Sequence, residues 1–528
     1  MKWRAFEWLS VAGLALVAFV LRALRLDHAG LGHFDEGGYG LGALAFARGE
    51  APDGFIAQQH FLSPPGYFGL AGMAMRRLGE SDHALLAISV LFGALTAPLV
   101  FALVRERGSR GGALAAGILI AFSDFHIRFS RTGLTDVSFT FLALLALLLF
   151  VRGERTNRLS SYLMGGIVTG LAWLTKYHGW LVGFVVILAH GPRLRERAVQ
   201  VRLFFAALLA VVLYWPWASY VQTQPGGYAA LTAEQGKFLS DWTDYFGHLW
   251  LHVDSQRFFE GPLTWLGLGL ALLVQTWIDE RDKFTRSLLL VPAVVVFAMS
   301  LGTLPTLILL WLLAGRTLQG VAPAVRVWTG VFAVLTPLYH AYPRLLMPLA
   351  CGLVMCVAPA LGGAVRFGRR APAFGLALAL AALWFAGPAN GRVVSSTQGP
   401  WSDTDGLRAI ANELNEAQGT PATFVVFAEP ALAFYLRTLG AQAVHVNSLE
   451  SLEAELQRDE PLVLLGGHYF RLLGVAETLA LDAPDSVLPW RGSDVRLLND
   501  AEPWRAREWQ AEDAQPHRIE VRRLPASE

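Results

Sequence analysis

The sequence predicts an all-α polytopic membrane protein with a small extracytoplasmic α/β domain at its C-terminal end. Three observations lead to this fold class. The 528 residues are 54% hydrophobic and only 16% charged, with a mean hydropathy of +0.42, which leaves too little charge to cover a soluble surface. Apolar segments recur from residue 8 to residue 389. Beyond residue 391 the pattern changes to short strands that alternate with helices.

A membrane helix needs about 17–25 mainly apolar residues, and by this measure we expect about 13 transmembrane helices. The segments lie near residues 8–25, 84–104, 111–124, 136–152, 160–176, 178–192, 202–220, 261–278, 287–301, 303–315, 327–341, 344–364 and 371–389. The first segment ends at Arg22, Arg25 and Asp27. A signal peptide would have a small-residue cleavage site there, so we expect an uncleaved helix.

Every second loop is rich in arginine and lysine, whereas the loops between them have only scattered cations. Cytoplasmic loops carry such an excess of basic residues, so we expect a multi-pass plasma-membrane protein with a cytoplasmic N-terminus. An odd number of spans then places the C-terminal domain outside the cytoplasm. The basic loops hold Arg105, Arg107 and Arg110; Arg152, Arg155 and Arg158; Arg193, Arg195, Arg197 and Arg202; Arg281, Lys283 and Arg286; Arg316 and Arg326; and Arg366, Arg369 and Arg370.

Two of the predicted outer loops are long. The first, residues 27–82, has amphipathic pieces at 39–48 and 67–77, which we expect to be helices that lie in the membrane interface. The second, residues 222–260, is rich in aromatic and charged residues. Loops of this length are often functional or disordered, and the aromatic content argues against disorder.

We expect two domains, a transmembrane domain at 1–390 and an α/β domain at 391–528. The second domain should contain helices at 405–418, 431–439 and 449–458, and strands at 423–427, 461–465 and 518–524. Because strands alternate with helices, a largely parallel sheet is expected.

Composition also argues against several functions. The net charge of +1 gives no support for nucleic-acid binding. The two cysteines, Cys351 and Cys356, lie in one apolar segment, which indicates membrane-embedded thiols rather than a disulfide or a metal site. The glycines at 267 and 269 lie in a transmembrane run and lack the strand–turn–helix context of a phosphate-binding loop.

An acidic pair, Asp35 and Glu36, follows the first span in the stretch Leu31-Gly32-His33-Phe34-Asp35-Glu36. Charged residues at the edge of a bilayer are costly to bury, so this pair suggests a functional site. The alternative is a solvated loop in which a helix begins at Asp35.

Cations stand at the predicted outward ends of other helices. Arg131, Lys176 and Arg344 suit a phosphate or diphosphate group, which Arg binds in a fork and Lys as a point charge. The carboxylates of the acidic pair and of Asp136 suit activation of a hydroxyl. Each residue also has a plain structural explanation, such as a helix cap for Asp136 or a snorkelling side chain for Lys176. A reaction in which a hydroxyl attacks an anionic lipid carrier at the outer leaflet would use both the cations and the carboxylates.

The order of these motifs resembles a known family. After the acidic pair come His-x-x-x-Pro-Pro at 60–65, a Ser-Arg…Asp loop at 130–136, Gly-Leu-Ala-Trp-Leu-Thr-Lys-Tyr-His-Gly at 170–179, and Tyr-Pro-Arg-Leu-Leu-Met-Pro at 342–348. Residues 1–390 thereby resemble the C-type membrane glycosyltransferases, specifically the family 39 and aminoarabinose-transferase-like group that includes protein O-mannosyltransferases.

The resemblance implies a glycosyltransferase that moves a sugar from a polyprenyl-phosphate donor to a hydroxyl of a lipid, glycan or protein. The transfer would take place at the outer face of the membrane, with inversion at the anomeric carbon. Asp35 would be the base, Glu36 its support, and Asp136 a second acid with an orienting role. The three cations named above would stabilise the charge of the leaving phosphate.

The same motifs suggest further contacts. Tyr177 and Tyr342 would join Arg131, Lys176 and Arg344 at the donor phosphate. Three other residues would contact substrate: His60, Tyr67 and His178. Some relatives bind a divalent metal near the acidic pair, so the resemblance leaves a metal cofactor open. Its candidate ligands are Glu36, His60 and His252, although no ligand spacing fixes them.

Two features depart from the family pattern. Gly37-Gly38 stand where relatives usually have a small residue and a bulkier one, which loosens the expected helix start. The 222–260 loop lacks the aromatic motif of the lipid A-modifying branch, so lipid A is not assigned as acceptor. The alternative function is a secondary transporter or lipid flippase. That class would show charges near mid-membrane and an inverted repeat, whereas the charges here cluster at outward ends and no repeat is present.

Overall fold

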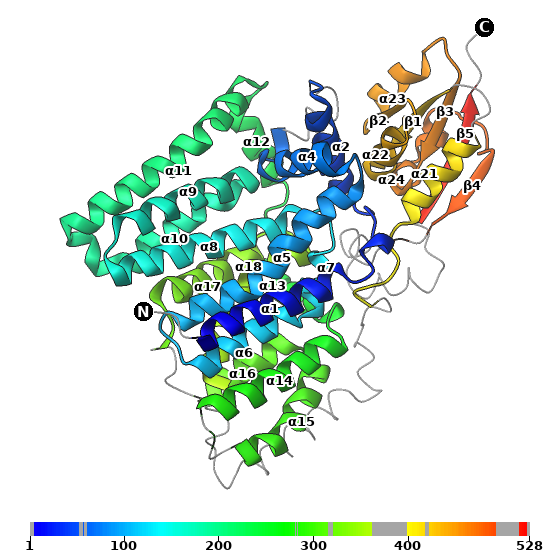
Figure 1. Ribbon diagram of the computed structural model, residues 1–528. Coiled ribbons are helices and arrows are strands. Elements are labelled where there is room, and N and C mark those ends of the chain that lie inside the picture. Colours follow the sequence, from blue (N-terminus) through cyan, green and yellow to red (C-terminus); the bar gives the residue numbers. More distant parts are fainter. Residues whose placement is uncertain are drawn as a thin grey trace. The chain divides into compact units, whose positions relative to one another are not determined.

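The computed structural model is mainly helical (Figure 1). It divides into two compact units. It describes residues 5–51, 56, 61–279, 281, 284–314, 320–361, 399–417, 422–490, 492 and 517–524. The first compact unit, which we call the helical unit, comprises Met1–Leu24, Val90–Ser130 and Thr135–Pro400. The second, which we call the sheet unit, comprises Arg25–Ser89, Arg131–Leu134 and Trp401–Glu528. The predicted domain boundary at residue 391 lies outside the described residues.

The helical unit is built from apolar helices, as the sequence predicts. Helix α5 (Asp82–Arg105) begins in the sheet unit and continues into this one. The other main helices are α1 (Ala5–Ala23), α6 (Arg110–Ala121), α7 (Asp124–Phe129), α8 (Thr135–Thr156), α9 (Leu159–Thr175), α10 (Leu181–His190), α11 (Arg197–Thr223), α12 (Gly227–Gly236), α13 (Tyr245–Phe258), α14 (Pro262–Asp279), α15 (Phe284–Leu301), α16 (Thr303–Ala314), α17 (Pro323–Leu335) and α18 (Met347–Val357).

Four helices of the described chain, α1, α5, α8 and α11, are long and apolar enough to cross a membrane. Helices α13 and α14, bent by 95° at their junction, would add a fifth span if they form one. Shorter apolar helices account for several other predicted segments: Arg110–Ala121, Leu159–Thr175, Tyr177–His190, Pro323–Leu338 and Pro343–Val357. The polytopic helical class is therefore confirmed, whereas the count of 13 is not. The predicted segment 371–389 lies beyond what the structure describes.

Small residues let neighbouring helices of this unit approach closely. A Cβ atom on Gly166 of α9 would stand 2.2 Å from the carbonyl oxygen of Ala206 of α11, so only glycine fits at this contact. Close approach through small residues is the usual way in which membrane helices associate. Gly302, at φ 101°, ends α15 and separates it from α16. A residue with positive φ cannot continue a right-handed α-helix, and glycine adopts positive φ at low cost.

Several arginines of the predicted basic loops are paired with buried or half-buried glutamates. The pairs are Glu7 with Arg105 (3.3 Å) and Arg110 (3.2 Å), and Glu106 with Arg152 (2.8 Å) and Arg155 (3.0 Å). Glu7 lies in the first turn of α1, and its carboxylate is only 1% exposed. One carboxylate shared by two cations ties each loop to a neighbouring helix of the same unit.

The sheet unit contains a five-stranded sheet in the order β2-β1-β3-β5-β4. Strands β1 (Thr423–Phe427), β2 (Ala443–Val446) and β3 (Leu462–Gly466) run parallel to one another. Strand β5 (Arg518–Leu524) is antiparallel to β3, and β4 (Ser486–Pro489) is antiparallel to β5. Helices α21 (Gly406–Glu416), α22 (Pro430–Thr438) and α23 (Leu449–Leu456) match the three predicted helices. The α/β class of the C-terminal part, Trp401–Glu528, which we call the tail, is confirmed. The sheet is not largely parallel as predicted, because two of its four strand pairings are antiparallel. Among the described residues, the sequence pattern also missed the short strands β2 and β4 and the short helices α24 (His468–Leu472) and α25 (Val475–Thr478).

The segment that follows the first helix folds together with this tail. Its helices α2 (Phe34–Arg48) and α4 (Gly66–Leu78) bury apolar side chains in one hydrophobic core with α21, α22 and the sheet. Buried members from the early segment include Leu31, Leu44 and Tyr67, and members from the tail include Leu432 and Phe434. The sequence predicts helices at 39–48 and 67–77 correctly, but it gives no sign of this shared core.

Candidate active site

The acidic pair occupies the first turn of α2, where Glu36 is bound by backbone groups. Its Oε2 accepts the N–H groups of Gly32 (2.9 Å) and His33 (2.8 Å). Its Oε1 accepts the N–H of Gly133 (2.6 Å), from the loop at 131–134. His33 is the N-cap, and its Nδ1 accepts the Asp35 N–H at 3.0 Å. Side chains thus satisfy the donors that a helix start leaves unpaired.

Asp35 and Glu36 therefore have different roles in this turn. Glu36 is only 2% exposed, and both of its oxygens accept backbone donors, so it stabilises the turn. Asp35 is less buried than its neighbour, and it lies in the first turn of α2, where the helix N-terminus favours an ionised carboxylate. The geometry favours Asp35 as the acid that meets a substrate.

Arg131 lies in the sheet unit with the acidic pair. Its side chain is buried, and its guanidinium donates to the carbonyl oxygen of Arg25 at 3.0 Å. Gly133, two residues further along, supplies one of the donors to Glu36. The loop at 131–134 therefore belongs structurally to the acidic turn, although the sequence grouped Arg131 with the other predicted phosphate ligands.

A second cluster, in the helical unit, contains Asp136, Lys176 and Arg344. Asp136 lies in the first turn of α8 and forms an ion pair with the Lys176 ammonium. The Arg344 Nε lies 3.8 Å from the other carboxylate oxygen. The Arg344 guanidinium also lies over the ring of Tyr342, 5.0 Å from its centroid. Two cations and one carboxylate give this cluster a net charge of +1, and the side chains of Lys176 and Arg344 are 20% and 14% exposed.

The chemistry of this second cluster suits a phosphate. A half-buried ammonium and guanidinium interact strongly with an anion because little water screens them. Asp136 holds both cations in place without cancelling their charge. His178 lies at the edge of the cluster, with its ring edge-on to Phe139 at 4.6 Å between centroids.

The remaining predicted site residues are spread more widely. The Tyr177 hydroxyl accepts a hydrogen bond from Trp217 Nε1 at 3.3 Å, beside α11. Tyr67 is fully buried, and its hydroxyl bonds to the Leu85 carbonyl (3.2 Å) and to Ser89 (3.0 Å). This place in the sheet unit core favours a packing role for Tyr67. His60 lies outside the described residues.

A metal does not fit the described acidic turn. The Glu36 oxygens are occupied by three backbone donors, which a cation would have to displace. His252 is fully buried in α13. Within the ranges that the structure describes, no group of three or more His, Cys, Asp or Glu residues could hold a metal ion.

Sequence reasoning missed a buried polar network at the end of α1. Arg22 is 0% exposed and donates to the carbonyls of Ile120 (3.0 Å) and Ala121 (3.2 Å), to Ser130 Oγ (3.2 Å) and to His126 Nδ1 (2.9 Å). It joins α1 to the end of α6 and to α7. The signal was an arginine inside an apolar segment, which normally faces protein rather than lipid.

One family model matches part of the chain. Residues 63–220 match the family model described as dolichyl-phosphate-mannose-protein mannosyltransferase. The match includes Arg131, Asp136 and Lys176, so the resemblance drawn from the motifs is confirmed over this stretch. A search of curated protein sequences finds no match.

Solved structures share the fold. The chain is similar to ArnT from Cupriavidus metallidurans bound to undecaprenyl phosphate, with 15% identity, a TM-score of 0.52 and 98% of each chain covered. It is also similar to the archaeal oligosaccharyltransferase AglB from Archaeoglobus fulgidus, in complex with an inhibitory peptide and a dolichol-phosphate. That match has 14% identity and a TM-score of 0.51, and it covers 88% of this chain and 70% of the other.

Proposed function

We propose that this protein is an integral-membrane glycosyltransferase that moves a sugar from a polyprenyl-phosphate donor to a hydroxyl acceptor. The observation that carries the proposal is the cluster of Lys176 and Arg344 around Asp136, whose net positive charge suits the donor phosphate. The family match over residues 63–220 contains two of these three residues. Both similar structures described above were solved with a polyprenyl phosphate bound.

In the proposed reaction, Asp35 accepts the proton of the acceptor hydroxyl. The hydroxyl oxygen attacks the anomeric carbon, and the bond between that carbon and the phosphate oxygen breaks. The polyprenyl phosphate leaves with the bonding electrons, and attack from the opposite face inverts the anomeric configuration. Lys176 and Arg344, with Tyr342 beside them, stabilise the charge that develops on the leaving phosphate.

We propose a plasma-membrane location, with the N-terminus in the cytoplasm and the α/β tail outside it. The alternating basic loops support this orientation. It gives both acidic and cationic residues access to the outer leaflet, where a hydroxyl of a lipid, glycan or protein would serve as acceptor.

The test is transfer of a labelled sugar. Purified protein is incubated with a labelled polyprenyl-phosphate sugar and a membrane extract, and Asp35→Asn is compared with wild type. We expect transfer by wild type and little or none by Asp35→Asn, because an amide cannot accept the proton. Asp482→Asn, which changes an exposed carboxylate of the tail, is the matched control and should transfer normally.

Other outcomes would contradict the proposal in identifiable ways. Full transfer by Asp35→Asn would remove Asp35 from catalysis. Transport of the donor lipid without its consumption would favour a secondary transporter or lipid flippase instead.

A further inference from the structure

The turn before α2 is held by side chains of the tail, within the sheet unit. Gly30 N–H donates to Thr404 Oγ1 at 3.1 Å, and Leu31 N–H donates to the Tyr435 hydroxyl at 2.7 Å. The next two N–H groups, of Gly32 and His33, donate to Glu36. Four consecutive backbone donors that lead to Asp35 are thus bound by side chains, and the first two depend on the tail.

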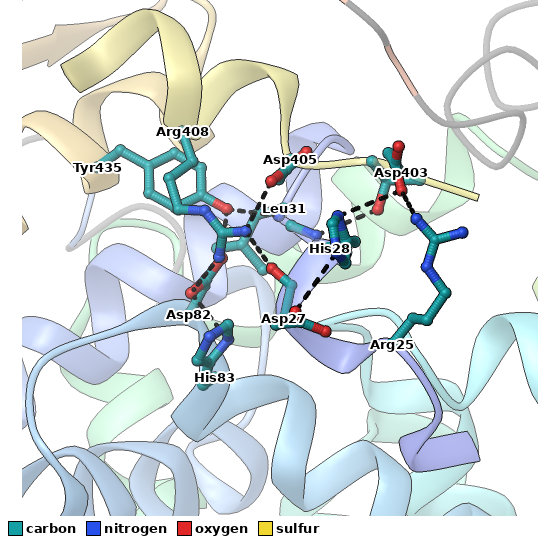
Figure 2. A network of polar contacts seen from close by, with 12 residues as sticks. Arg25, Asp27, His28, Leu31, Asp82, His83, Asp403, Asp405, Arg408 and Tyr435 are labelled. Carbon is teal, nitrogen blue, oxygen red and sulfur yellow. Dashed lines mark hydrogen bonds and ion pairs between the residues drawn. The ribbon is translucent and has the colours of Figure 1, made fainter. Parts of the chain in front are cut away.

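Tyr435 is the centre of this arrangement, as Figure 2 shows. Its hydroxyl accepts the Leu31 N–H and donates to Asp82 Oδ2, also at 2.7 Å. Its ring is 3% exposed in the core. Burial and the adjacent Asp82 raise the pKa of Tyr435 well above its ordinary value, so the hydroxyl keeps its proton. A hydroxyl that both accepts and donates has little freedom to move.

Arg408 of α21 also binds Asp82. Its guanidinium lies 3.1 Å from Asp82 Oδ2, and it also donates to the Asp27 carbonyl (2.6 Å) and to Asp405 (2.9 Å). Figure 2 shows these groups around Leu31, with Arg25 and His28 joined to Asp403 nearby. Two tail side chains, Tyr435 and Arg408, therefore converge on the start of α5 and on the turn.

The tail also contacts the helix start directly. A Cβ atom on Gly37 would stand 2.0 Å from the backbone nitrogen of Ala431 in α22, so the two backbones touch at this position. The ring of Phe34, immediately before Asp35, lies edge-on to His445 and Tyr469 of the tail, with centroids 6.2 and 6.3 Å apart. The glycine that departs from the family pattern is thus required by the close approach of α22.

We propose that Tyr435 is a positioning residue for sugar transfer, which fixes the Leu31–Glu36 turn and through it Asp35. This inference rests on the proposed function, because it assigns the tail a task in that reaction. The tail residue does not touch the reacting atoms. It determines where the backbone of the acidic turn lies, and a displaced base loses rate steeply, by about 100-fold per ångström in unfavourable cases.

The test compares wild type with Tyr435→Phe in the full-length protein. The variant keeps the ring in the core and removes the hydroxyl. We expect faster hydrogen exchange in peptides that contain Leu31, because its N–H loses its acceptor. We also expect kcat to fall by about tenfold to 100-fold, with KM for the donor changed by less than about twofold, because the substitution alters no proposed ligand of the donor phosphate.

Two further variants separate positioning from general stability. Tyr162→Phe removes a buried hydroxyl that bonds to His190 Nε2 at 3.0 Å in the helical unit. It should leave exchange at Leu31 and kcat unchanged. Thr404→Val removes the acceptor of the Gly30 N–H and should act like Tyr435→Phe with a smaller effect. If Tyr435→Phe fails to fold, Thr404→Val alone decides the question.

The outcomes distinguish this inference from the proposed function. Wild-type exchange at Leu31 and wild-type kcat in Tyr435→Phe would overturn the positioning role while leaving the transferase intact. An equal loss of kcat in Tyr162→Phe would also overturn it, because the effect would then be one of stability alone. Absence of sugar transfer by wild type would overturn the proposed function and with it the catalytic part of the inference. The exchange measurement would still test whether Tyr435 holds the turn.

Discussion

Asp35 and Glu36 are neighbours in sequence, but their environments differ. Three backbone N–H groups surround the Glu36 carboxylate, and a buried carboxylate that is fully hydrogen-bonded to backbone has a structural role. Asp35 is the less buried of the two. The difference arises because Glu36 points back toward the turn, as the fourth residue of a capping box does.

Glu36→Gln should destabilise the protein. The amide NH2 would face at least one backbone N–H, so an acceptor is lost and a donor is left against a donor. A lost hydrogen bond to a buried charged group costs about 1–3 kcal/mol. Thermal unfolding should show a lower Tm for Glu36→Gln than for Asp35→Asn, whose Tm should stay near that of wild type. The reverse order would contradict the division of roles.

Lys176 should act on donor binding. Lys176→Gln removes a charged partner of the phosphate, so affinity for a polyprenyl phosphate should fall by about 10-fold to 100-fold, as expected for a hydrogen bond to a charged group. Titration of the purified protein with undecaprenyl phosphate measures this. Lys237→Gln, which changes an exposed lysine paired with Glu234, is the control and should bind normally. Equal affinity in Lys176→Gln would remove Lys176 from the donor site.

At the level of elements, glycine decides which helices can touch. Gly37 allows the backbone of α2 to meet that of α22, and Gly166 does the same for α9 and α11. Gly69, on α4, has no heavy atom within 4 Å of its Cβ position. The same residue type is therefore essential at one helix position and replaceable at another.

Gly37→Ala should lower both Tm and transfer activity, because α22 must move away from α2 to make room for the methyl group. Overpacking of this kind typically costs about 1–3 kcal/mol. Gly69→Ala is the matched control. It should raise stability slightly, by up to about 1 kcal/mol, because alanine is the better helix former. Thermal unfolding and the sugar-transfer assay measure both variants, and a wild-type Tm for Gly37→Ala would refute the close packing.

At the scale of the whole molecule, segments far apart in the sequence fold together. The sheet unit joins residues 25–89, 131–134 and 401–528, so the acidic turn and the tail fold as one body. A substitution that destabilises the sheet unit should therefore lower sugar transfer, even where it lies far along the chain from Asp35.

The ring nitrogens of His445 in β2 are buried, so the stability of the sheet unit should depend on pH. Burial lowers the pKa of His445 from 6.5 to about 3. Between these values the unfolded chain binds more protons than the folded one, so stability falls as pH decreases below about 6.5. At pH 5 the loss from this group is about 2 kcal/mol. The Tm difference between pH 7 and pH 5 should be smaller in His445→Leu than in wild type. Equal differences would exclude His445 as the cause.

Much of the fold follows from local sequence patterns. Apolar runs located α1, α5, α8 and α11, and alternating strands and helices located β1, β3, β5 and the three tail helices. The number of spans does not follow from the apolar segments, because several apolar helices are short and α13 and α14 meet at a 95° bend. The short strands β2 and β4 have too few residues to show a clear pattern.

The candidate site is also only partly predictable from local sequence. The sequence itself indicated an acidic pair, a lysine and arginines at the ends of apolar segments, because charge is conspicuous against hydrophobic surroundings. Only the tertiary structure shows that the Glu36 carboxylate is bound by backbone donors, one of them the N–H of Gly133, 97 residues further along the chain. It also showed that Tyr435 holds Leu31 across 404 residues. Such contacts depend on how distant segments pack, which no local pattern of hydropathy or charge records.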